Sequence, residues 1–441
     1  MELSKLLGTC FGCACGREHD LPVRRFVYEP GALEALPDCV GQEGAKRVVV
    51  VADARTWHVA GERAYEALRR AGIEAARIIV PDGEGGGPVC DDETCGGLRE
   101  QLRGMGPEMV VGAGSGVIND LCKWSSFELG LPYAVVATAA SMNGYAAANV
   151  AARVAGVKVL VEARPPVAVV AEPDVITGAP REMTTAGFGD TIAKYQSGAD
   201  WLMNHLLLDE YYCAFCAGIV NDLEPLYLAR PEDIAEGKGR AIGGLFEALF
   251  WSGVAMTVVG TSAPASGGEH LLSHTLDMVA DARGERHDLH GRQVGVGTLV
   301  SAALYERIVA LESPEIGGLP EKIDGGYWGH PGLVEAVGQQ YAGKRPSVDR
   351  VREALAGKGA WDVLRARLAE ATKRPGTVRD WLRRAGGAVT PGDIGCSREA
   401  LRAAMLHMHE MRRRLTIVDL AWMVGVLPAA ADEIIDAWLT S

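Results

Sequence analysis

The chain has 441 residues, of which 48% are apolar, 6% aromatic and 23% charged. A length of this order predicts two domains that each bury a core, and the composition is that of a globular enzyme rather than a fibrous or disordered chain. The formal net charge of -13 argues against a nucleic-acid-binding surface, and an anionic ligand would need a local basic pocket because the overall field repels it.

The N-terminal residues carry no basic stretch that leads into an apolar one, so the sequence predicts no secretion signal and a cytoplasmic location. The longest charge-free stretch, 129–152, is interrupted by proline, glycine, serine and asparagine. The apolar stretch 248–260 is shorter than the roughly 20 residues that a membrane-spanning helix requires. We therefore expect no membrane span, and a buried helix over 248–260.

Ten cysteines in a cytoplasmic chain are predicted to be reduced thiols. Four residues near the N-terminus form a set that could coordinate zinc, although their crowding restricts a tetrahedral geometry: Cys10, Cys13, Cys15 and His19. The alternative interpretation is an N-terminal arm without a function of its own. Cys213 and Cys216 have the spacing of half a metal site, but no second pair accompanies them and segment 211–220 has helical apolar character, which favours core packing.

The first half of the chain alternates between strand and helix patterns. Segment 47–53 is a run of β-branched residues that ends in the carboxylate of Asp53, and segment 56–71 has helical spacing. Further strands are expected at 75–80, 107–112, 133–138 and 167–171. Continuous apolar strands separated by helices indicate a parallel sheet covered on both faces. We predict an α/β, Rossmann-like nucleotide-binding domain over residues 1–182.

The glycine-rich segment 112–116 follows an expected strand and opens a helix near Val117. Its backbone N–H groups and the helix N-terminus can cradle a pyrophosphate, although glycine after a strand is often only a tight turn and the spacing differs from Gly-x-Gly-x-x-Gly. Asp53 can accept hydrogen bonds from an adenosine ribose and would repel a 2′-phosphate, which favours NAD over NADP. It can also be a simple cap residue, since a helix follows.

After Pro180 the strand patterns stop, and helices are expected at 190–208, 211–228, 241–259, 270–282 and 291–311. We predict an all-α, metal-binding domain over residues 183–441. Asp190 is expected to follow a glycine-rich approach to a helix, and helical spacing would place it on one face with Lys194.

One carboxylate with two or three imidazoles suits zinc, iron or nickel, and three protein ligands leave a position open for a substrate oxygen. His270 and His274 lie one helical turn apart, and His290 stands beside Gly291. Histidines with this spacing are also common on an exposed helix face.

Several short segments, spread over most of the chain, carry recognisable motifs. In chain order they are 114–120 (Gly-Ser-Gly-Val-Ile-Asn-Asp), 141–145 (Ser-Met-Asn-Gly-Tyr), 187–194 (Gly-Phe-Gly-Asp-x-x-x-Lys), 199–201 (Ala-Asp-Trp), 268–274 (Gly-Glu-His-x-x-x-His), 290–291 (His-Gly) and 411–416 (Met-Arg-Arg-Arg-Leu-Thr). They resemble the superfamily of metal-dependent polyol dehydrogenases and dehydroquinate synthases, and in particular the glycerol-1-phosphate dehydrogenases. The resemblance implies a dehydroquinate synthase-like fold.

The resemblance implies three metal ligands, Asp190, His270 and His290, with zinc the first expectation and nickel or iron the alternatives. Lys194 stands where related iron-dependent alcohol dehydrogenases have a further histidine ligand, and a protonated lysine cannot coordinate a metal. His274 is expected to hydrogen-bond the substrate or relay a proton. Lys194 is expected to act beside it at the catalytic site and, with Lys158, is a candidate for holding the substrate phosphate. His287 lacks a following glycine and is expected at the surface.

With Asp53, the residues expected to contact NAD or NADP are Gly114, Ser115, Gly116, Val117, Ile118, Asp120, Thr138 and Ser141. Asn143 stands where the glycerol-1-phosphate dehydrogenases usually have an aspartate that is expected to bind the polyol. Ala147 likewise replaces a serine near the cofactor. Lys158 matches a family lysine near the active site and is expected to attract phosphate, or equally to be a solvated lysine.

The resemblance implies the reversible, nicotinamide-dependent reduction of dihydroxyacetone phosphate to glycerol 1-phosphate, in a homo-oligomer. Asn143, Lys158, Asp190 and His274 are the residues expected at the substrate. Three alternatives stay open: a dehydrogenase of an unphosphorylated polyol such as glycerol, a dehydroquinate synthase-like lyase that uses NAD transiently, and a non-catalytic protein that keeps the fold.

Overall fold

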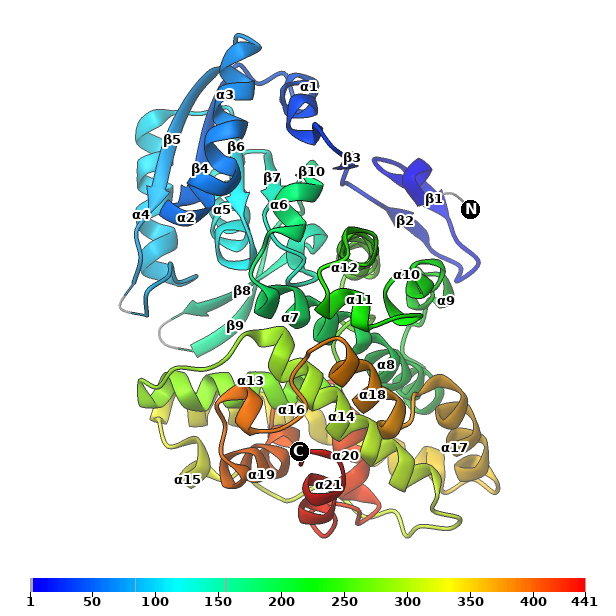
Figure 1. The fold of residues 1–441 in the computed structure, drawn as a ribbon. Helices are drawn as coiled ribbons and strands as arrows, with labels where there is room; N and C mark the ends of the chain where they lie inside the picture. Colours follow the sequence, from blue (N-terminus) through cyan, green and yellow to red (C-terminus); the bar gives the residue numbers. More distant parts are fainter. Residues whose placement is uncertain (1–2, 84, 155–156, 441) are drawn as a thin grey trace. The chain divides into compact units, whose positions relative to one another are not determined.

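The computed structural model describes residues 3–83, 85–154 and 157–440 (Figure 1). The chain forms two compact units, which we call the first and the second unit. The first comprises Met1–Gly187 and Gly218–Thr261, and the second comprises Phe188–Ala217 and Ser262–Ser441. The predicted division at residue 182 therefore needs correction, because residues 218–261 belong to the first unit.

The first unit is built on a six-stranded parallel sheet in the order β3-β10-β7-β6-β4-β5. Its strands are β3 (Arg25–Tyr28), β4 (Arg47–Asp53), β5 (Glu74–Val80), β6 (Met109–Gly114), β7 (Tyr133–Ala137) and β10 (Ala168–Ala171). Every residue of β6, β7 and β10 is buried, as a parallel sheet covered on both faces requires. The predicted strands coincide with these to within two residues, apart from the short edge strand β3.

Helices and two antiparallel hairpins complete the sheet domain. The hairpins are β1 (Cys10–Gly12) with β2 (Glu18–Asp20), and β8 (Asn149–Val154) with β9 (Val157–Glu162). The predicted helix 56–71 consists of three successive pieces, α2 (Ala54–Thr56), the π-helical turn η3 (Trp57–Gly61) and α3 (Glu62–Arg70). The other helices are η1 (Leu3–Leu6), η2 (Ala32–Ala35), α1 (Leu36–Gln42), α4 (Asp92–Met105), α5 (Gly116–Leu129), η4 (Gly144–Ala146) and α6 (Pro173–Thr177).

Helix α12 (Gly239–Val259) joins the first unit through its aromatic residues. The ring of Phe250 stacks on Phe26 of β3 with centroids 4.1 Å apart, and Phe246 lies 5.2 Å from Tyr28. These contacts explain why 218–261 groups with the sheet although its helical pattern suggested the other domain. Within the described residues α12 is long and apolar enough to cross a membrane, but most of it is buried in the protein, as expected for 248–260.

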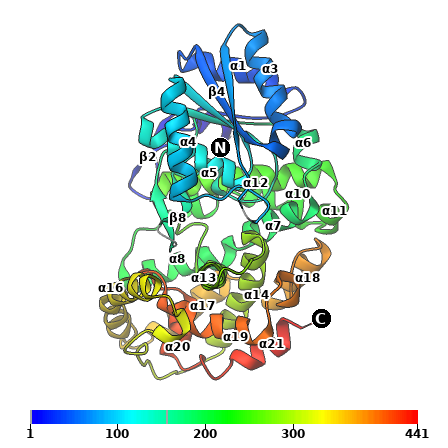
Figure 2. The same ribbon diagram turned by 90° about the vertical axis from the view of Figure 1, so that its left-hand side faces the viewer.

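The second unit is helical throughout its described residues (Figure 2). Helices α13 (Gly268–Arg283) and α14 (His290–Val309) pack against each other. The expected helix 211–228 is instead divided into α9 (Ala214–Ala217), η5 (Asn221–Leu223) and α10 (Glu224–Leu228), with Gly218 and Pro225 in the interrupted stretch. The remaining helices of the second unit are α8 (Lys194–Leu208), α15 (Gly325–Trp328), α16 (Pro331–Leu355), α17 (Ala360–Ala371), α18 (Pro375–Arg384), η6 (Gly392–Ile394), α19 (Arg398–His407), η7 (Met408–Glu410), α20 (Ile417–Met423) and α21 (Ala431–Trp438). Helices η5, α10 and α11 (Glu232–Ala235) lie in the first unit.

Helix α7 (Arg181–Ile192) corrects the expectation for the segment around Asp190. The glycines before Asp190 lie inside this helix rather than in an approach to it, and Lys194 opens the next helix after a break at Ala193. Asp190 and Lys194 therefore do not share a face of one helix. Close packing explains the glycine at Gly189, because a Cβ there would lie 2.2 Å from the backbone oxygen of Gly291.

Candidate metal centre and cofactor loops

The three predicted metal ligands gather in the second unit, although they come from three helices. Asp190 lies in α7, His270 in α13, and His290 is the first residue of α14. Their ligating atoms all lie within 4.8 Å of one another, and Nε2 of His270 is 3.3 Å from Oδ1 of Asp190. Asp190 and His270 are buried and His290 is half-buried. The structure thus brings the three residues together, while their binding of a metal stays a prediction.

Hydrogen bonds orient both histidines of this cluster. The Oγ of Ser273 donates to Oε1 of Gln293 at 2.7 Å, so its 2.8 Å contact with Nδ1 of His290 must be one that it accepts. The carboxylate of Glu269 lies 2.9 Å from Nδ1 of His270. Both imidazoles therefore carry a proton on Nδ1, and in their neutral form they keep a lone pair on Nε2. Two such nitrogens and one carboxylate oxygen fit a divalent metal such as zinc.

A buried pair of carboxylates holds the start of α13, from which His270 projects. Asp200 accepts hydrogen bonds from the backbone N–H groups of Gly268 and Ile417, both at 2.7 Å. Glu269 accepts one from the N–H of Gly267 at 2.6 Å. Burial raises the pKa of Asp200 to about 8, and the negative charge of Glu269 adds to the shift. Asp200 and Glu269 both lie in segments that carry the family resemblance, but the sequence alone predicted no role for either residue.

His274 lies one turn after His270 and close to the cluster. Its ring centroid is 5.4 Å from that of His290, and its Nδ1 is 3.3 Å from Nη2 of Arg412. Since arginine donates and does not accept, Nδ1 of neutral His274 accepts this hydrogen bond and its proton sits on Nε2. His274 thus presents a donor, where His270 and His290 present lone pairs.

Arg412 is the main site residue that the sequence analysis did not single out. Its backbone has the left-handed φ of 57°, rare for a residue with a side chain. The backbone N–H donates to Oε1 of Gln340 at 2.9 Å, and the guanidinium donates to Oγ of Ser266 at 2.8 Å. Desolvation lowers the pKa of Arg412 to about 10, with a contribution from Arg414, so it remains a cation at neutral pH. Its membership of the quoted segment 411–416 was the available signal.

The other basic candidates have different surroundings. The Nζ of Lys194 lies 5.1 Å from the ring centre of Tyr195, which is a cation–π distance. Lys158 lies in β9 opposite Arg153. His287 is partly exposed, with Nδ1 3.1 Å from a carboxylate oxygen of Asp277, and it is not part of the ligand cluster. The roles proposed for Lys158 and Lys194 stay predictions.

The predicted cofactor residues of the first unit follow three neighbouring strands, β7, β6 and β4. Because the strands are parallel, their carboxyl ends share one edge of the sheet, where nucleotides bind in such folds. Gly114 ends β6, and a Cβ there would lie 2.5 Å from the Cβ of Ile118. Ser115 precedes α5 without capping it, and its Oγ is 2.6 Å from Oγ of Ser141. The Ser115 hydroxyl therefore leaves the N–H groups of Gly116, Val117 and Ile118 for an anionic ligand.

Other predicted cofactor residues have structural partners within the first unit. Oδ1 of Asp53 accepts from the N–H groups of Arg55 and Thr56 at 2.8 and 3.0 Å, which is the cap arrangement. Asp120 accepts from the N–H of Ala151 at 3.2 Å. The N–H of Thr138 donates to the oxygen of Gly114 at 3.2 Å. Contact of these residues with a nucleotide stays a prediction.

Asn143 stands at the start of η4, next to helix α12. A Cβ at Gly253 would lie 2.3 Å from the backbone oxygen of Asn143, so glycine at this position of α12 permits the close approach. The structure therefore fixes the backbone of Asn143, and its proposed contact with the substrate stays a prediction.

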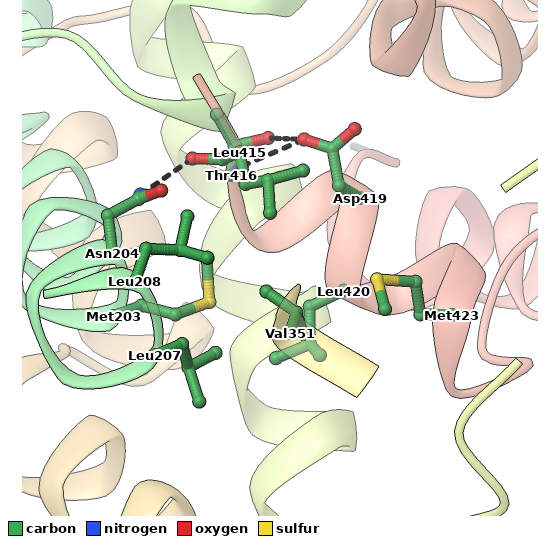
Figure 3. Close-up of a pocket in the computed structure, with 10 residues that line it drawn as sticks. All are labelled: Met203, Asn204, Leu207, Leu208, Val351, Leu415, Thr416, Asp419, Leu420 and Met423. Carbon is green, nitrogen blue, oxygen red and sulfur yellow. Dashed lines mark hydrogen bonds between the residues drawn. The ribbon is translucent and has the colours of Figure 1, made fainter. Parts of the chain in front are cut away.

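A hollow in the second unit is not lined by the candidate metal ligands or by His274 (Figure 3). The amide of Asn204 donates to the oxygen of Leu415 at 2.8 Å, and Asp419 accepts from Oγ1 of Thr416 at 3.1 Å. These polar groups therefore bond within the wall, and the remaining lining is apolar. Its lining residues are Met203, Asn204, Leu207, Leu208, Val351, Leu415, Thr416, Asp419, Leu420 and Met423.

Comparison with known proteins identifies the class. A family model described as iron-containing alcohol dehydrogenase matches residues 27–180. Among solved structures, a glycerol dehydrogenase from Schizosaccharomyces pombe shares the fold with a TM-score of 0.60 at 15% identity, over 94% of this chain and 91% of that one. The chain has the fold of the iron-containing alcohol dehydrogenases.

Curated relatives narrow the family. The glycerol-1-phosphate dehydrogenase (NAD(P)+) of Bacillus velezensis is 30% identical over 398 residues, which cover 90% of each chain. That of Halalkalibacterium halodurans is 34% identical over 297 residues, 67% of this chain and 74% of the relative. The chain belongs to the glycerol-1-phosphate dehydrogenase family within the iron-containing alcohol dehydrogenase superfamily.

Proposed function

We propose that the protein is a metal- and NAD(P)-dependent sn-glycerol-1-phosphate dehydrogenase, cytoplasmic and homo-oligomeric, which reversibly reduces dihydroxyacetone phosphate. The carrying observation is the convergence of Asp190, His270 and His290 within 4.8 Å, in a chain related over most of its length to enzymes of that name. A divalent metal held there would polarise the substrate carbonyl, and the reduced nicotinamide would supply the hydride.

The reduction adds a hydride to the carbonyl carbon and a proton to its oxygen. His274 is suited to protonate the oxygen, because the hydrogen bond from Arg412 to its Nδ1 keeps its proton on Nε2. It is therefore our candidate for donating or relaying the proton. Ser273 and Glu269 do different work: they hold His290 and His270 with lone pairs on Nε2.

Arg412 is our first candidate for holding the substrate phosphate. A chain of net charge -13 repels an anion at long range, so a fixed cation is needed near the reacting group. The Arg412 guanidinium lies 3.3 Å from His274, and its planar set of donors matches phosphate geometry. Lys158 and Lys194 remain the candidates from the sequence.

The presence of asparagine at position 143 favours the alternative functions, a dehydrogenase of an unphosphorylated polyol or a lyase. The asparagine occupies the place of an aspartate expected to bind the polyol. An amide retains hydrogen bonding but loses the charge.

The test is NADH oxidation with dihydroxyacetone phosphate, dihydroxyacetone and glyceraldehyde 3-phosphate as separate substrates, before and after chelation with zinc or nickel added back. Chelator-sensitive oxidation with dihydroxyacetone phosphate alone supports the proposal. Activity with dihydroxyacetone alone identifies the polyol dehydrogenase, and product formation without net NADH change identifies the lyase.

A matched pair of arginine variants tests the phosphate contact. Arg412→Ala should raise KM for dihydroxyacetone phosphate roughly 10- to 100-fold, a loss of about 1.4–2.7 kcal/mol, which is the size of a charge-assisted hydrogen bond. Arg413→Ala, at the exposed neighbouring position, should leave KM unchanged. Equal KM values in both variants would remove Arg412 from the site.

A further inference from the structure

The N-terminal hairpin β1–β2 gathers a second set of metal-ligand side chains, in the first unit. Its strands pair Phe11 with His19. The loop is closed by the N–H of Cys13, which donates to the oxygen of Arg17 at 3.0 Å, and by the N–H of Gly16, which donates to the oxygen of Cys13 at 3.0 Å. Gly16 has the left-handed φ of 84°. This tight loop turns both of its cysteines toward the second strand.

Three side chains of the hairpin converge there. The Sγ atoms of Cys13 and Cys15 and a ring nitrogen of His19 lie within 4.8 Å of one another, and Sγ of Cys15 is 3.4 Å from Nε2 of His19. The cysteines are half-buried and His19 is 2% exposed. In a tetrahedral zinc site a sulfur and a nitrogen ligand stand about 3.6 Å apart, given bonds of about 2.3 and 2.1 Å.

We propose that Cys13, Cys15 and His19 bind a structural zinc ion, at a site separate from the cluster of Asp190, His270 and His290. Two thiolates and an imidazole are the donors that structural zinc sites use. The hairpin has strands of three residues each, too short to be stable by their own pairing. A zinc ion supplies the missing cross-link.

The surroundings of His19 agree with this role. Its imidazole hydrogen-bonds the backbone of Val258, in α12 of the same unit. A histidine that binds zinc through one nitrogen commonly donates from the other to a backbone carbonyl. The zinc would thus hold the hairpin against α12.

Cys10, included in the set expected from the sequence, is not part of this group. It is exposed, and its Sγ donates to Oδ1 of Asp20 at 3.4 Å. That hydrogen bond raises the pKa of Cys10, which favours the thiol over the thiolate. Cys10 therefore provides a matched control.

Three protein ligands leave the fourth coordination position of the zinc for water or a further thiolate.

The experiment measures zinc content and cobalt spectra of the full-length protein, purified with reductant. Wild type should hold about two metal ions per chain, and Cys13→Ser or Cys15→Ser about one. With cobalt, the thiolate charge-transfer band should be present in wild type, Cys10→Ser and His270→Ala, and absent in Cys13→Ser. NADH oxidation should persist in Cys13→Ser and be lost in His270→Ala, so the two sites fail independently.

Two further measurements keep the proposal testable if the serine variants do not fold. Cys15→His replaces one zinc ligand by another and should restore both zinc content and soluble protein. In wild type, a mercurial that titrates thiols should release about one zinc per chain while the remainder stays bound. A wild-type protein without a thiolate–cobalt band, or equal zinc loss in Cys10→Ser and Cys13→Ser, overturns the proposal.

Discussion

The two ligand clusters of this chain are built in opposite ways. Asp190, His270 and His290 are far apart in sequence, and three helices bring their nitrogen and oxygen donors together. Cys13, Cys15 and His19 are close in sequence, and a single turn brings two sulfurs and a nitrogen together. The first arrangement depends on the tertiary fold of a whole unit, and the second on a few backbone hydrogen bonds.

The difference shows how the ligand atoms of a metal site relate to its role, catalytic or structural. A site with one carboxylate and two imidazoles keeps a position for a substrate oxygen, whereas thiolates suit a closed structural site. In the helical cluster each imidazole is oriented by a buried neighbour, Ser273 or Glu269. We therefore expect chemistry at the helical cluster and local stability at the hairpin.

The largest difference in turnover between the two clusters is expected when a metal ligand is removed from each. His270→Ala should lower turnover by about 10³-fold or more, because the polarisation of the carbonyl is worth several kcal/mol. NADH binding, followed by fluorescence, should be retained because the cofactor loops lie in the first unit. Cys15→Ser should leave turnover within about two-fold at low temperature. A large loss in Cys15→Ser with normal turnover in His270→Ala would reverse the assignment.

A second contrast concerns the glycine that each cluster requires. Gly189→Ala places a methyl group against the backbone of Gly291 and should lower the free energy of unfolding by about 3 kcal/mol. Gly16→Ala, at a positive φ with open space around it, should cost about 1–2 kcal/mol. Urea denaturation measures both. The control is Gly198→Ala in α8, which has open space and should be neutral or slightly stabilising; a Gly189→Ala protein as stable as this control would contradict the packing argument.

The third contrast concerns the residues behind the ligands. Ser273→Ala removes the acceptor that orients His290 and should weaken metal binding by about 10- to 100-fold, as such changes typically do. Competition with a chromophoric chelator measures the affinity. The exposed Ser313 gives the control Ser313→Ala, which should bind as wild type does. Unchanged affinity in Ser273→Ala would mean that the helices alone orient His290.

The smallest expected effect is a pH dependence of the free energy of unfolding that comes from one buried histidine, His409, and not from the metal ligands. His409 is buried between Tyr341 and Trp422. Burial lowers its pKa to about 3 from 6.5, with the charge of Lys344 adding to the shift. Between these values the unfolded chain binds a proton that the folded chain does not, so stability falls as pH falls from 6.5, by about 1.4 kcal/mol per pH unit.

Urea denaturation of metal-free protein at pH 7, 6 and 5 measures this slope. His409→Phe should have a flatter pH dependence than wild type, and exposed His330→Gln should have the wild-type slope. Parallel curves for wild type and His409→Phe would assign the acid sensitivity to other groups.

Much of the sheet could be predicted from the sequence because its strands are continuous apolar runs. Segment 47–53 has the bounds of β4, whereas β3 was missed because its four residues carry an arginine at the sheet edge. The start of α7 was missed for a tertiary reason. Glycine is unfavourable inside a helix, and the need for it at Gly189 appears only once the backbone of Gly291 is known to lie beside it.

The candidate sites differ in the same respect. No spacing rule links Asp190 to His270 and His290, and only the resemblance to a family joined them before the structure did. The hairpin ligands could be listed from the sequence because they are neighbours there, but excluding Cys10 required its contact with Asp20. Arg412 stood in the segment 411–416 that carries the family resemblance, but its role could not be predicted, since its left-handed backbone and its contact with His274 exist only in the folded chain.

The interleaving of the two units has a consequence for synthesis on the ribosome. The chain passes from one unit to the other near residues 187, 217 and 261, so the sheet is translated long before the helix that covers Phe26 and Tyr28. Until α12 has left the exit tunnel, those aromatic rings face solvent, and the nascent α12 is apolar enough to be taken for a membrane anchor. We expect the emerging chain to need a chaperone over this interval, and no single cut of the gene yields both units complete.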